Sequence, residues 1–374
     1  MIPRIVAQRC RHVFETVCVH ANGEVVCSII DGRGDFVVGN VHEQSIGEIF
    51  DGPRYRELRR LVLSTADHYC PAIGKRCPLK TVPVLEGAPD IAHEIRFLQI
   101  EPTSACDLRC LSCPVRDFSS DTTWRDAYHD GGASFLAWDG LRRSKQHAAD
   151  ALRGIAPGLA ARPPEKRGRL EAALLRGRIK KGRRGTLPIE VLKKVVSDLP
   201  RSLERVDFYN YGEPFLYYRL VEALRHVRAC LPASGIAIST DGMQVRETIE
   251  EVLVDERLVD WIIFSIDGSD ADTYARYRIG GTFETAFHNL VRFHRKAAGT
   301  GIHVIWQYVV FRWNDRDEQL RRAIAIADEH GIPLWFDFSR TWGRSRRRAG
   351  DLSYLEPYLK PETGLPRQAG HYWP

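Results

Sequence analysis

The fold is constrained most by an alternation of short apolar segments with amphipathic segments, which starts at Glu94 and continues almost to the end of the chain. The apolar segments are rich in β-branched and aromatic residues, as are strands buried on both faces of a parallel sheet. The predicted strands are 95–100, 206–209, 236–239, 261–266, 303–310 and 334–338. The predicted helices between them are 188–199, 216–229, 282–298 and 317–330. This order predicts an α/β fold, a partial (β/α)6 barrel with its functional groups at the carboxyl ends of the strands.

Three cysteines directly follow the first predicted strand. Cys106, Cys110 and Cys113 have the spacing C-x3-C-x2-C and are followed by Pro114. Three thiolates in such a loop can hold a [4Fe–4S] cluster and leave one iron without a protein ligand. An open coordination position is typical of catalytic metal sites. The alternative is a zinc site that takes its fourth ligand from elsewhere, although zinc loops usually pair C-x2-C units.

Polar segments follow the next three predicted strands in order. They are Tyr211-Gly212-Glu213-Pro214, Ser239-Thr240-Asp241-Gly242 and Ser265-Ile266-Asp267-Gly268, the last of which continues through Arg278 to Gly280-Gly281. Together with the cysteine loop, these segments resemble the motifs of the radical S-adenosylmethionine (AdoMet) superfamily, in order and in place. The resemblance runs from about residue 94 to residue 339 and identifies the chain as a member of that superfamily.

The resemblance implies a reaction and a set of cofactor contacts. The open iron of the cluster binds AdoMet, and reductive cleavage yields a 5′-deoxyadenosyl radical that abstracts a substrate hydrogen. Such an oxidoreductase-like enzyme needs an electron donor such as a flavodoxin or a ferredoxin. The residues expected near AdoMet are Tyr211, Gly212, Glu213, Pro214, Ser239, Ser265, Asp267, Arg278 and Gln307. Glycine allows close backbone approach and the Glu213 carboxylate accepts from an ammonium group, whereas Tyr211 stands where many members have a glycine.

Five further cysteines lie in the first 77 residues, around a predicted hairpin of 16–21 and 24–30 that turns at Asn22-Gly23. This region resembles the SPASM/twitch module, which holds auxiliary [4Fe–4S] clusters but usually follows the barrel rather than preceding it. Five cysteines cannot ligate two clusters, so we expect one. The expected ligands are Cys10, Cys27, Cys70 and Cys77, with Cys18 a possible ligand that is better explained as a core residue. A zinc site built from the same four cysteines is the alternative.

The predicted organisation is a small, loop-rich N-terminal iron–sulfur module (1–88), a radical SAM partial barrel (89–345) with a basic inserted segment (121–185), and a C-terminal tail (346–374). Ser45 and Glu48 predict a capped helix over 45–64 in the N-terminal module.

The net charge of +6 is local, because 141–185 carries +11 and the rest of the chain −5. That stretch lacks interleaved aromatic residues, so we expect no nucleic-acid partner; a solvated helical face is favoured over a lid for an anionic substrate.

The location and the substrate class follow from weaker signals. There is no apolar run of about 18 residues, and Arg4 and Arg9 interrupt any signal-peptide pattern, so we expect a cytoplasmic protein with reduced thiols and no membrane span. A single auxiliary cluster resembles the arrangement in radical AdoMet enzymes that act on aminocyclitols and aminoglycosides. This resemblance implies oxidation, epimerisation or rearrangement of a polar small molecule such as a sugar or an aminocyclitol. A maturase for a ribosomally made peptide or protein is the second reading. A non-catalytic iron–sulfur or zinc scaffold is a third.

Cys230 stands apart from the other cysteines, near the end of a predicted helix. Some members of the superfamily use a lone cysteine to return a hydrogen atom to the substrate radical. Cys230 is therefore a candidate hydrogen donor, although a buried helix cysteine is the more common case.

Overall fold

The structure is a computed structural model of the chain, and it describes residues 5–8, 12–27, 37–64, 69–70, 75–76, 83–85, 93–110, 113, 185–339, 345, 347 and 349–359. The basic inserted segment lies outside these residues up to position 184. In the described part of the chain, no helix combines the length and the apolar character that a membrane span requires.

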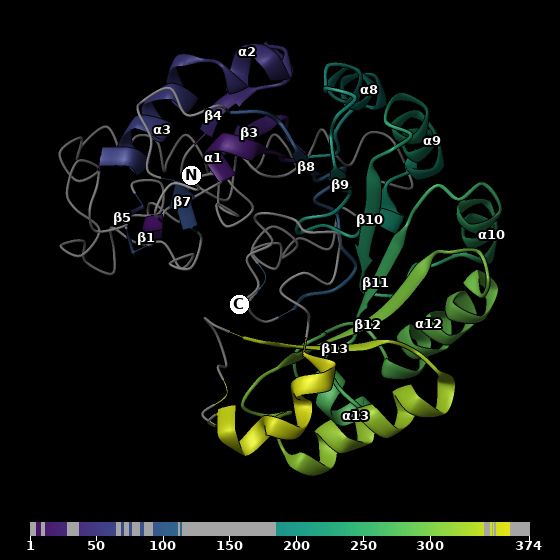
Figure 1. Cartoon of the computed structure of the whole chain (residues 1–374). Helices are drawn as coiled ribbons and strands as arrows, with labels where there is room; N and C mark the ends of the chain where they lie inside the picture. Colours follow the sequence, from purple (N-terminus) through teal and green to yellow (C-terminus); the bar gives the residue numbers. More distant parts are fainter. Residues whose placement is uncertain are drawn as a thin grey trace, which may run out of the picture.

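A nine-stranded sheet in the order β13-β12-β11-β10-β9-β8-β2-β3-β4 organises the molecule (Figure 1). Six of its strands are parallel and adjacent. They are β8 (Phe97–Ile100), β9 (Arg205–Asp207), β10 (Gly235–Thr240), β11 (Trp261–Ser265), β12 (His303–Val310) and β13 (Leu334–Phe338). The sheet does not close on itself within the described residues, so the predicted partial (β/α)6 barrel is confirmed.

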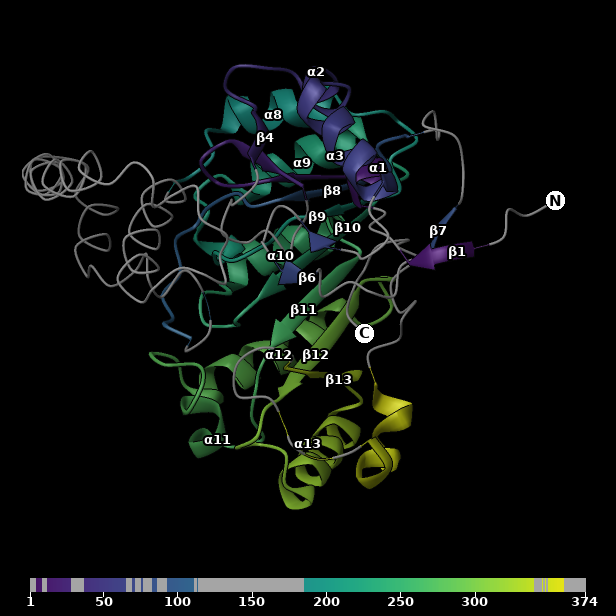
Figure 2. The same ribbon diagram turned by 90° about the vertical axis from the view of Figure 1, so that its left-hand side faces the viewer.

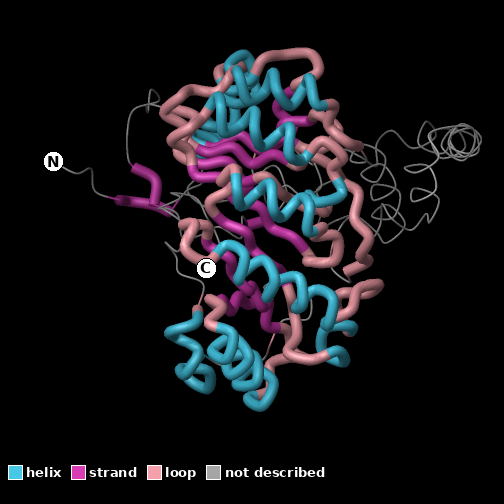
Figure 3. Tube along the Cα trace, turned by 90° about the vertical axis from the view of Figure 1, so that its right-hand side faces the viewer, coloured by secondary structure: helices cyan, strands magenta, loops and turns pink. Residues whose placement is uncertain are grey.

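Helices cover one face of this sheet. They are α8 (Ile189–Ser197), α9 (Leu220–Cys230), α10 (Glu247–Asp255), α11 (Ala271–Ala275), α12 (Phe283–Ala297) and α13 (Asp317–His330). The helical layer lies in front of the strands in Figure 3 and behind them in Figure 2. Alternate strand residues such as Val206, Ile238 and Phe264 point into this layer and form the main core. The short helices α10 and α11 were absent from the sequence-based prediction.

The opposite, inner face of the strands carries polar side chains. Gln99 pairs in register with Asp207 on β9, and Ser265 pairs with Gln307 on β12. Gln99 and Asp207 are buried, although their neighbours in sequence face the apolar core. This inner face is mixed rather than wholly polar, because Ile263 and Ile305 form a small apolar cluster on it, packed against Trp261 and Trp335.

The N-terminal hairpin extends the barrel sheet. β2 (Thr16–Val19) pairs in parallel with β8, so that Val17 lies opposite Leu98, and β3 (Glu24–Val26) and β4 (Val37–Asn40) add antiparallel strands at the edge. The turn between β2 and β3 uses Gly23 at φ +83°, a conformation that favours glycine. The N-terminal hairpin and the barrel thus share one sheet.

The predicted helix over 45–64 is two helices, α2 (Ile46–Phe50) and α3 (Pro53–Ser64). The expected cap is present, because Glu48 N donates to Ser45 Oγ at 3.2 Å and Ser45 N donates to Glu48 Oε2 at 2.8 Å. The single-helix expectation is wrong because Pro53 has no N–H for a helical bond and fits best as a first helical residue.

The other described elements are short. β1 (Ile5–Gln8) pairs with β7 (Pro83–Leu85), and β5 (Tyr69–Cys70) pairs with β6 (Lys75–Arg76), both antiparallel. The remaining helices are α1 (His12–Glu15) and the 3₁₀ segments η2 (Pro214–Leu216) and η3 (Ala349–Tyr358).

Candidate active site

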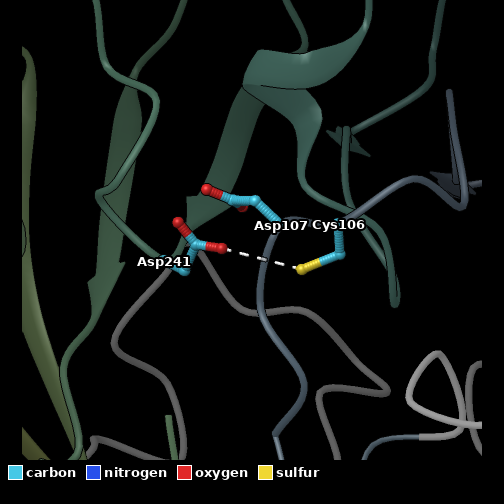
Figure 4. Close-up of side chains that lie close together, drawn as sticks. All are labelled: Cys106, Asp107 and Asp241. Atoms are coloured by element: carbon cyan, nitrogen blue, oxygen red, sulfur yellow. Dashed lines mark hydrogen bonds between the residues drawn. The ribbon is translucent and has the colours of Figure 1, made fainter. Parts of the chain in front are cut away.

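The cysteine loop lies at the carboxyl end of β8, beside the residue that follows β10. Cys106 Sγ lies 3.7 Å from Asp241 Oδ2, as Figure 4 shows. Ligand atoms of Cys106, Asp107 and Asp241 all lie within 4.8 Å of one another. Cys110 is buried, and the N–H of Cys113 donates to its carbonyl at 3.1 Å. These side chains therefore meet at the carboxyl ends of the parallel strands, where the sequence placed the functional groups.

Gly212 lets the segment after β9 touch this loop. A Cβ at Gly212 would come 1.8 Å from the carbonyl oxygen of Thr103, a backbone atom that cannot turn aside. The next residue, Glu213, donates its N–H to Ala105 O at 2.8 Å. The Tyr211-Gly212-Glu213-Pro214 segment therefore forms a backbone contact with the residues just before Cys106, and only glycine fits at position 212.

The Glu213 carboxylate is buried and turned toward the end of β10. It accepts hydrogen bonds from Thr240 Oγ1 at 2.9 Å, Asp241 N at 2.8 Å and Phe215 N at 3.0 Å. Burial raises the pKa of Glu213 to about 7 despite these three donors. This carboxylate thus fixes the end of β10 relative to the end of β9.

The site is electrostatically strained without a cation. Burial, followed by the nearby charge of Glu213, raises the pKa of Asp241 well above its ordinary value. Burial also raises the pKa of the Cys106 thiol and raises that of Cys110 to about 12. Asp107 Oδ1 is buried and has no hydrogen-bond partner among the described residues. Thiolates and carboxylates this close together need added positive charge, so the donor set fits an iron–sulfur cluster.

A buried ion pair approaches Cys110 from β11. Asp267 is fully buried, and its Oδ2 accepts from Arg278 Nε at 2.7 Å while its Oδ1 accepts from Val309 N at 2.9 Å. Asn314 Nδ2 donates to the Asp267 carbonyl at 3.0 Å. Held in this way, Arg278 directs Nη1 toward Cys110 Sγ at 3.8 Å. Asp267 is therefore a positioning residue for the guanidinium group.

Three more of the predicted cofactor contacts lie on the inner face at the same end of the sheet. The hydroxyl oxygens of Ser239 and Ser265 are 3.2 Å apart, and Gln307 lies beside Ser265 in register. The structure thus brings together the strand-end segments that the sequence singled out.

Sequence reasoning missed other groups at this site. Gln244 Nε2 donates to Asp107 Oδ2 at 2.6 Å, a bond between residues 137 positions apart. Asp241 was not among the predicted site residues, although it lies within a motif that the sequence singled out. Its place directly after a strand is the signal that could have identified it as a site residue. The contact of Gln244 has no sequence signal, because the fold alone creates it.

Cys230 does not lie at this site. It is the last residue of α9, which returns the chain to the start of β10, so it lies at the opposite end of the strands from the cysteine loop. Its Sγ is 3.4 Å from His226 Nε2 and 3.9 Å from Ser197 Oγ, on the helical layer. Because parallel-strand topology separates Cys230 from the cysteine loop, its position favours the reading as a helix cysteine over that as a hydrogen donor.

The predicted auxiliary ligands are only partly within the described residues. Cys27 is buried just after β3, and Cys70 lies in β5. Cys10 and Cys77 lie outside the described residues. Cys18 is fully buried in β2, and its Sγ donates to Gln99 Oε1 at 3.3 Å. These contacts agree with a packed position for Cys18.

Comparison with protein families matches residues 100–324 to the radical SAM superfamily and residues 10–78 to SPASM, an iron–sulfur cluster-binding domain. The chain therefore belongs to the radical SAM superfamily. This membership implies a [4Fe–4S] cluster with AdoMet, and the SPASM match implies auxiliary iron–sulfur binding ahead of the barrel in the sequence. No curated protein matches the chain.

Several solved structures are similar to the chain at low identity. Native anSMEcpe with bound AdoMet is 15% identical over 67% of this chain and 55% of that one, with a TM-score of 0.38. BtrN in complex with AdoMet and 2-DOIA is 15% identical over 56% and 55%, with a TM-score of 0.31. A radical SAM methyltransferase from Sphaerobacter thermophilus is 17% identical over 47% and 55%, with a TM-score of 0.36. The chain spans just over half the length of each.

Proposed function

We propose that this protein is a radical SAM enzyme whose Cys106, Cys110 and Cys113 hold the catalytic [4Fe–4S] cluster. The observation that carries the proposal is the meeting of the cysteine loop with buried acidic side chains at the carboxyl ends of the parallel strands. When bound, the cluster and AdoMet supply a one-electron reductive cleavage that produces a carbon radical able to abstract a hydrogen atom from the substrate. An external donor such as a flavodoxin or a ferredoxin delivers the electron.

The protein residues bind and orient the reactants. Gly212 allows the backbone of the Tyr211–Pro214 segment to approach the cysteine loop. From this position the segment would hold the amino group of AdoMet. Ser239, Ser265 and Gln307 offer hydroxyl and amide groups on the inner face to AdoMet or to the substrate. Asp267 holds Arg278 against Cys110.

We propose a polar small molecule, such as a sugar or an aminocyclitol, as the substrate. The support is the inner face of the sheet, where Gln99, Ser239, Ser265 and Gln307 present groups that both donate and accept hydrogen bonds. Such groups match the hydroxyls and amines of a polyol. A ribosomally made peptide is the second candidate, because the chain matches the SPASM domain and many SPASM enzymes modify peptides. The reaction is an oxidation, an epimerisation or a rearrangement.

We further propose that the N-terminal module holds one auxiliary [4Fe–4S] cluster, with Cys10, Cys27, Cys70 and Cys77 as its ligands. Its role is to accept an electron from the substrate radical. We also propose that the protein works in the cytoplasm with no nucleic-acid partner, since the thiols that it needs stay reduced there.

Iron content and AdoMet cleavage test the core of the proposal. Anaerobically reconstituted protein is expected to hold about eight irons per chain, four for each cluster, and to release 5′-deoxyadenosine under reduction. Cys110→Ala abolishes release, whereas the matched variant Cys230→Ala leaves iron and release unchanged because its thiol lies at the other end of the strands. Zinc in place of iron, with no 5′-deoxyadenosine, would identify a metal scaffold and refute the enzyme.

The substrate class is tested by stimulation of 5′-deoxyadenosine release. A panel of deuterated aminocyclitols and sugars is compared with a panel of deuterated peptides, and deuterium transferred into 5′-deoxyadenosine identifies the hydrogen that is abstracted. Transfer from a peptide alone would overturn the choice of a polyol.

The iron content also tests the auxiliary cluster. About four irons per chain, with AdoMet cleavage intact, would show that the protein holds no auxiliary cluster.

A further inference from the structure

Tyr274 has a buried hydroxyl group to which the described residues offer no acceptor. It lies in α11 and its side chain is fully buried. Its Oη has no hydrogen-bond partner among the described residues. A buried hydroxyl without an acceptor is costly, so its retention calls for a physical reason.

The hydroxyl lies on the Cys110 side of the candidate active site. Burial raises the pKa of Tyr274, and the charges that act on the hydroxyl come from Arg278, Asp241, Cys110 and Asp267. The group therefore keeps its proton at neutral pH and is available as a donor.

Two glycines hold the ring and leave room for the hydroxyl. A Cβ at Gly268 would come 2.4 Å from Tyr274 N, so α11 packs directly on the turn after β11. A Cβ at Gly281 would come 2.6 Å from Tyr274 Oη, 3.0 Å from Leu108 Cδ2 and 3.3 Å from Met243 Sδ. The rings of Phe283 and Tyr274 pack in a T-shaped arrangement with centroids 6.3 Å apart. The hydroxyl is thus held in one place beside Leu108 of the cysteine loop.

We propose that Tyr274 donates a hydrogen bond to a sulfur atom of the iron–sulfur cluster on its Cys110 side, and so makes this cluster easier to reduce. This inference rests on the proposed function of Cys106, Cys110 and Cys113. Arg278 Nη1, 3.8 Å from Cys110 Sγ, already shows a donor directed at sulfur from the same side. Hydrogen bonds to cluster sulfurs stabilise the reduced state, which carries more negative charge. The cluster thus gives the Tyr274 hydroxyl an acceptor, which the part of the chain that the structure describes does not supply.

The test compares the reduced-to-oxidised ratio of this cluster at a fixed applied potential, without AdoMet, by EPR. The signal of the cluster is the part that Cys110→Ala removes. Tyr274→Phe is expected to lower the ratio about fivefold, the effect of one net hydrogen bond. Gly281→Ala displaces the hydroxyl and lowers the ratio in the same direction, with no further loss in the double variant. Tyr217→Phe, which removes a buried hydroxyl bonded to Leu187 O at 2.8 Å, leaves the ratio unchanged.

Thermal unfolding of the metal-free protein separates this role from a structural one. Because the hydroxyl has no hydrogen-bond partner among the described residues, Tyr274→Phe is expected to leave the melting temperature unchanged or higher. A clear fall would show that the hydroxyl stabilises the fold itself. An unchanged ratio at full iron content, or a change in AdoMet affinity alone, would overturn the inference and leave the proposed function standing. If Tyr274→Phe takes up less iron than the wild type, the reduced-to-oxidised ratio of Gly281→Ala is compared with that of the wild type instead. A lower ratio supports the inference, and an unchanged ratio overturns it. A wild-type protein without a Cys110-dependent signal would overturn both.

Discussion

Replacing Gly212 with alanine places a methyl group where the structure has a backbone carbonyl. The new Cβ would lie 1.8 Å from Thr103 O, and contacts of this kind below 3.0 Å essentially never occur in real proteins. The two backbone segments must therefore separate by about 1.2 Å to reach 3.0 Å. No side-chain rotation relieves the contact, because both partners belong to the main chain.

The separation has a structural and a chemical cost. It breaks the 2.8 Å hydrogen bond from Glu213 N to Ala105 O, the residue before Cys106. Overpacking of about 1–3 kcal/mol and the lost hydrogen bond of about 1 kcal/mol lower the free energy of unfolding by about 2–4 kcal/mol. A displacement of about 1 Å at reacting groups costs about 100-fold in rate. We therefore expect Gly212→Ala to remain folded and to release 5′-deoxyadenosine at least about 100-fold more slowly.

The assay combines urea unfolding of the metal-free protein with anaerobic measurement of 5′-deoxyadenosine. Gly47→Ala is the matched control, because a Cβ at this position in α2 would meet nothing within 4 Å. Alanine there stabilises the helix by about 0.5–1 kcal/mol and leaves cleavage unchanged. Wild-type iron content, stability and cleavage in Gly212→Ala would show that the close approach is not needed, and would refute the reasoning.

Three further perturbations test other parts of the site. Asp267→Asn leaves Arg278 without its carboxylate partner, so we expect it to lower the free energy of unfolding by about 3–5 kcal/mol and to impair cleavage of AdoMet. The control is Asp272→Asn, at an exposed position, which is expected to change neither. Equal denaturant midpoints for Asp267→Asn and the wild type would contradict this expectation. Since burial raises the pKa of Glu213 to about 7, its protonated form stabilises the fold below about pH 4.5, and this contribution is lost as the pH rises through about 7. Glu213→Gln therefore flattens the fall in metal-free stability between pH 5 and 7 measured by urea unfolding, and an unchanged slope would argue against the buried carboxyl. Cys18→Ala is expected to keep all its iron and to lose about 1–2 kcal/mol of stability with the Gln99 contact, while loss of about four irons would make Cys18 a ligand.

The barrel was predictable because its strands carry a repeating signal. The predicted strands 303–310 and 334–338 and the predicted helix 317–330 coincide with β12, β13 and α13. The capping pair Ser45 and Glu48 was predictable for the same reason, since the bond spans only three residues. Local patterns of this kind are written in consecutive residues and need no tertiary context.

Other features were not predictable from local patterns. The break before Pro53 was hidden inside a long helical pattern, and α11 is too short to show a helical period. The position of Cys230, by contrast, was predictable, because it ends the helix that leads into a predicted strand and so lies at the amino ends of the strands. The polar inner face escaped notice because short strands covered on both sides need not alternate visibly.

The sequence by itself determined the family, the parallel order of the barrel strands and the three cysteines that begin the site, since each depends on residue type and spacing within a short segment. Only the tertiary structure decided which groups surround those cysteines. Gln244 reaches Asp107 across 137 positions, Asp267 directs Arg278 toward Cys110, and Tyr274 turns its hydroxyl into the same space. Such contacts arise when strand ends distant in sequence meet at one edge of the sheet, and that meeting is a property of packing rather than of any local pattern.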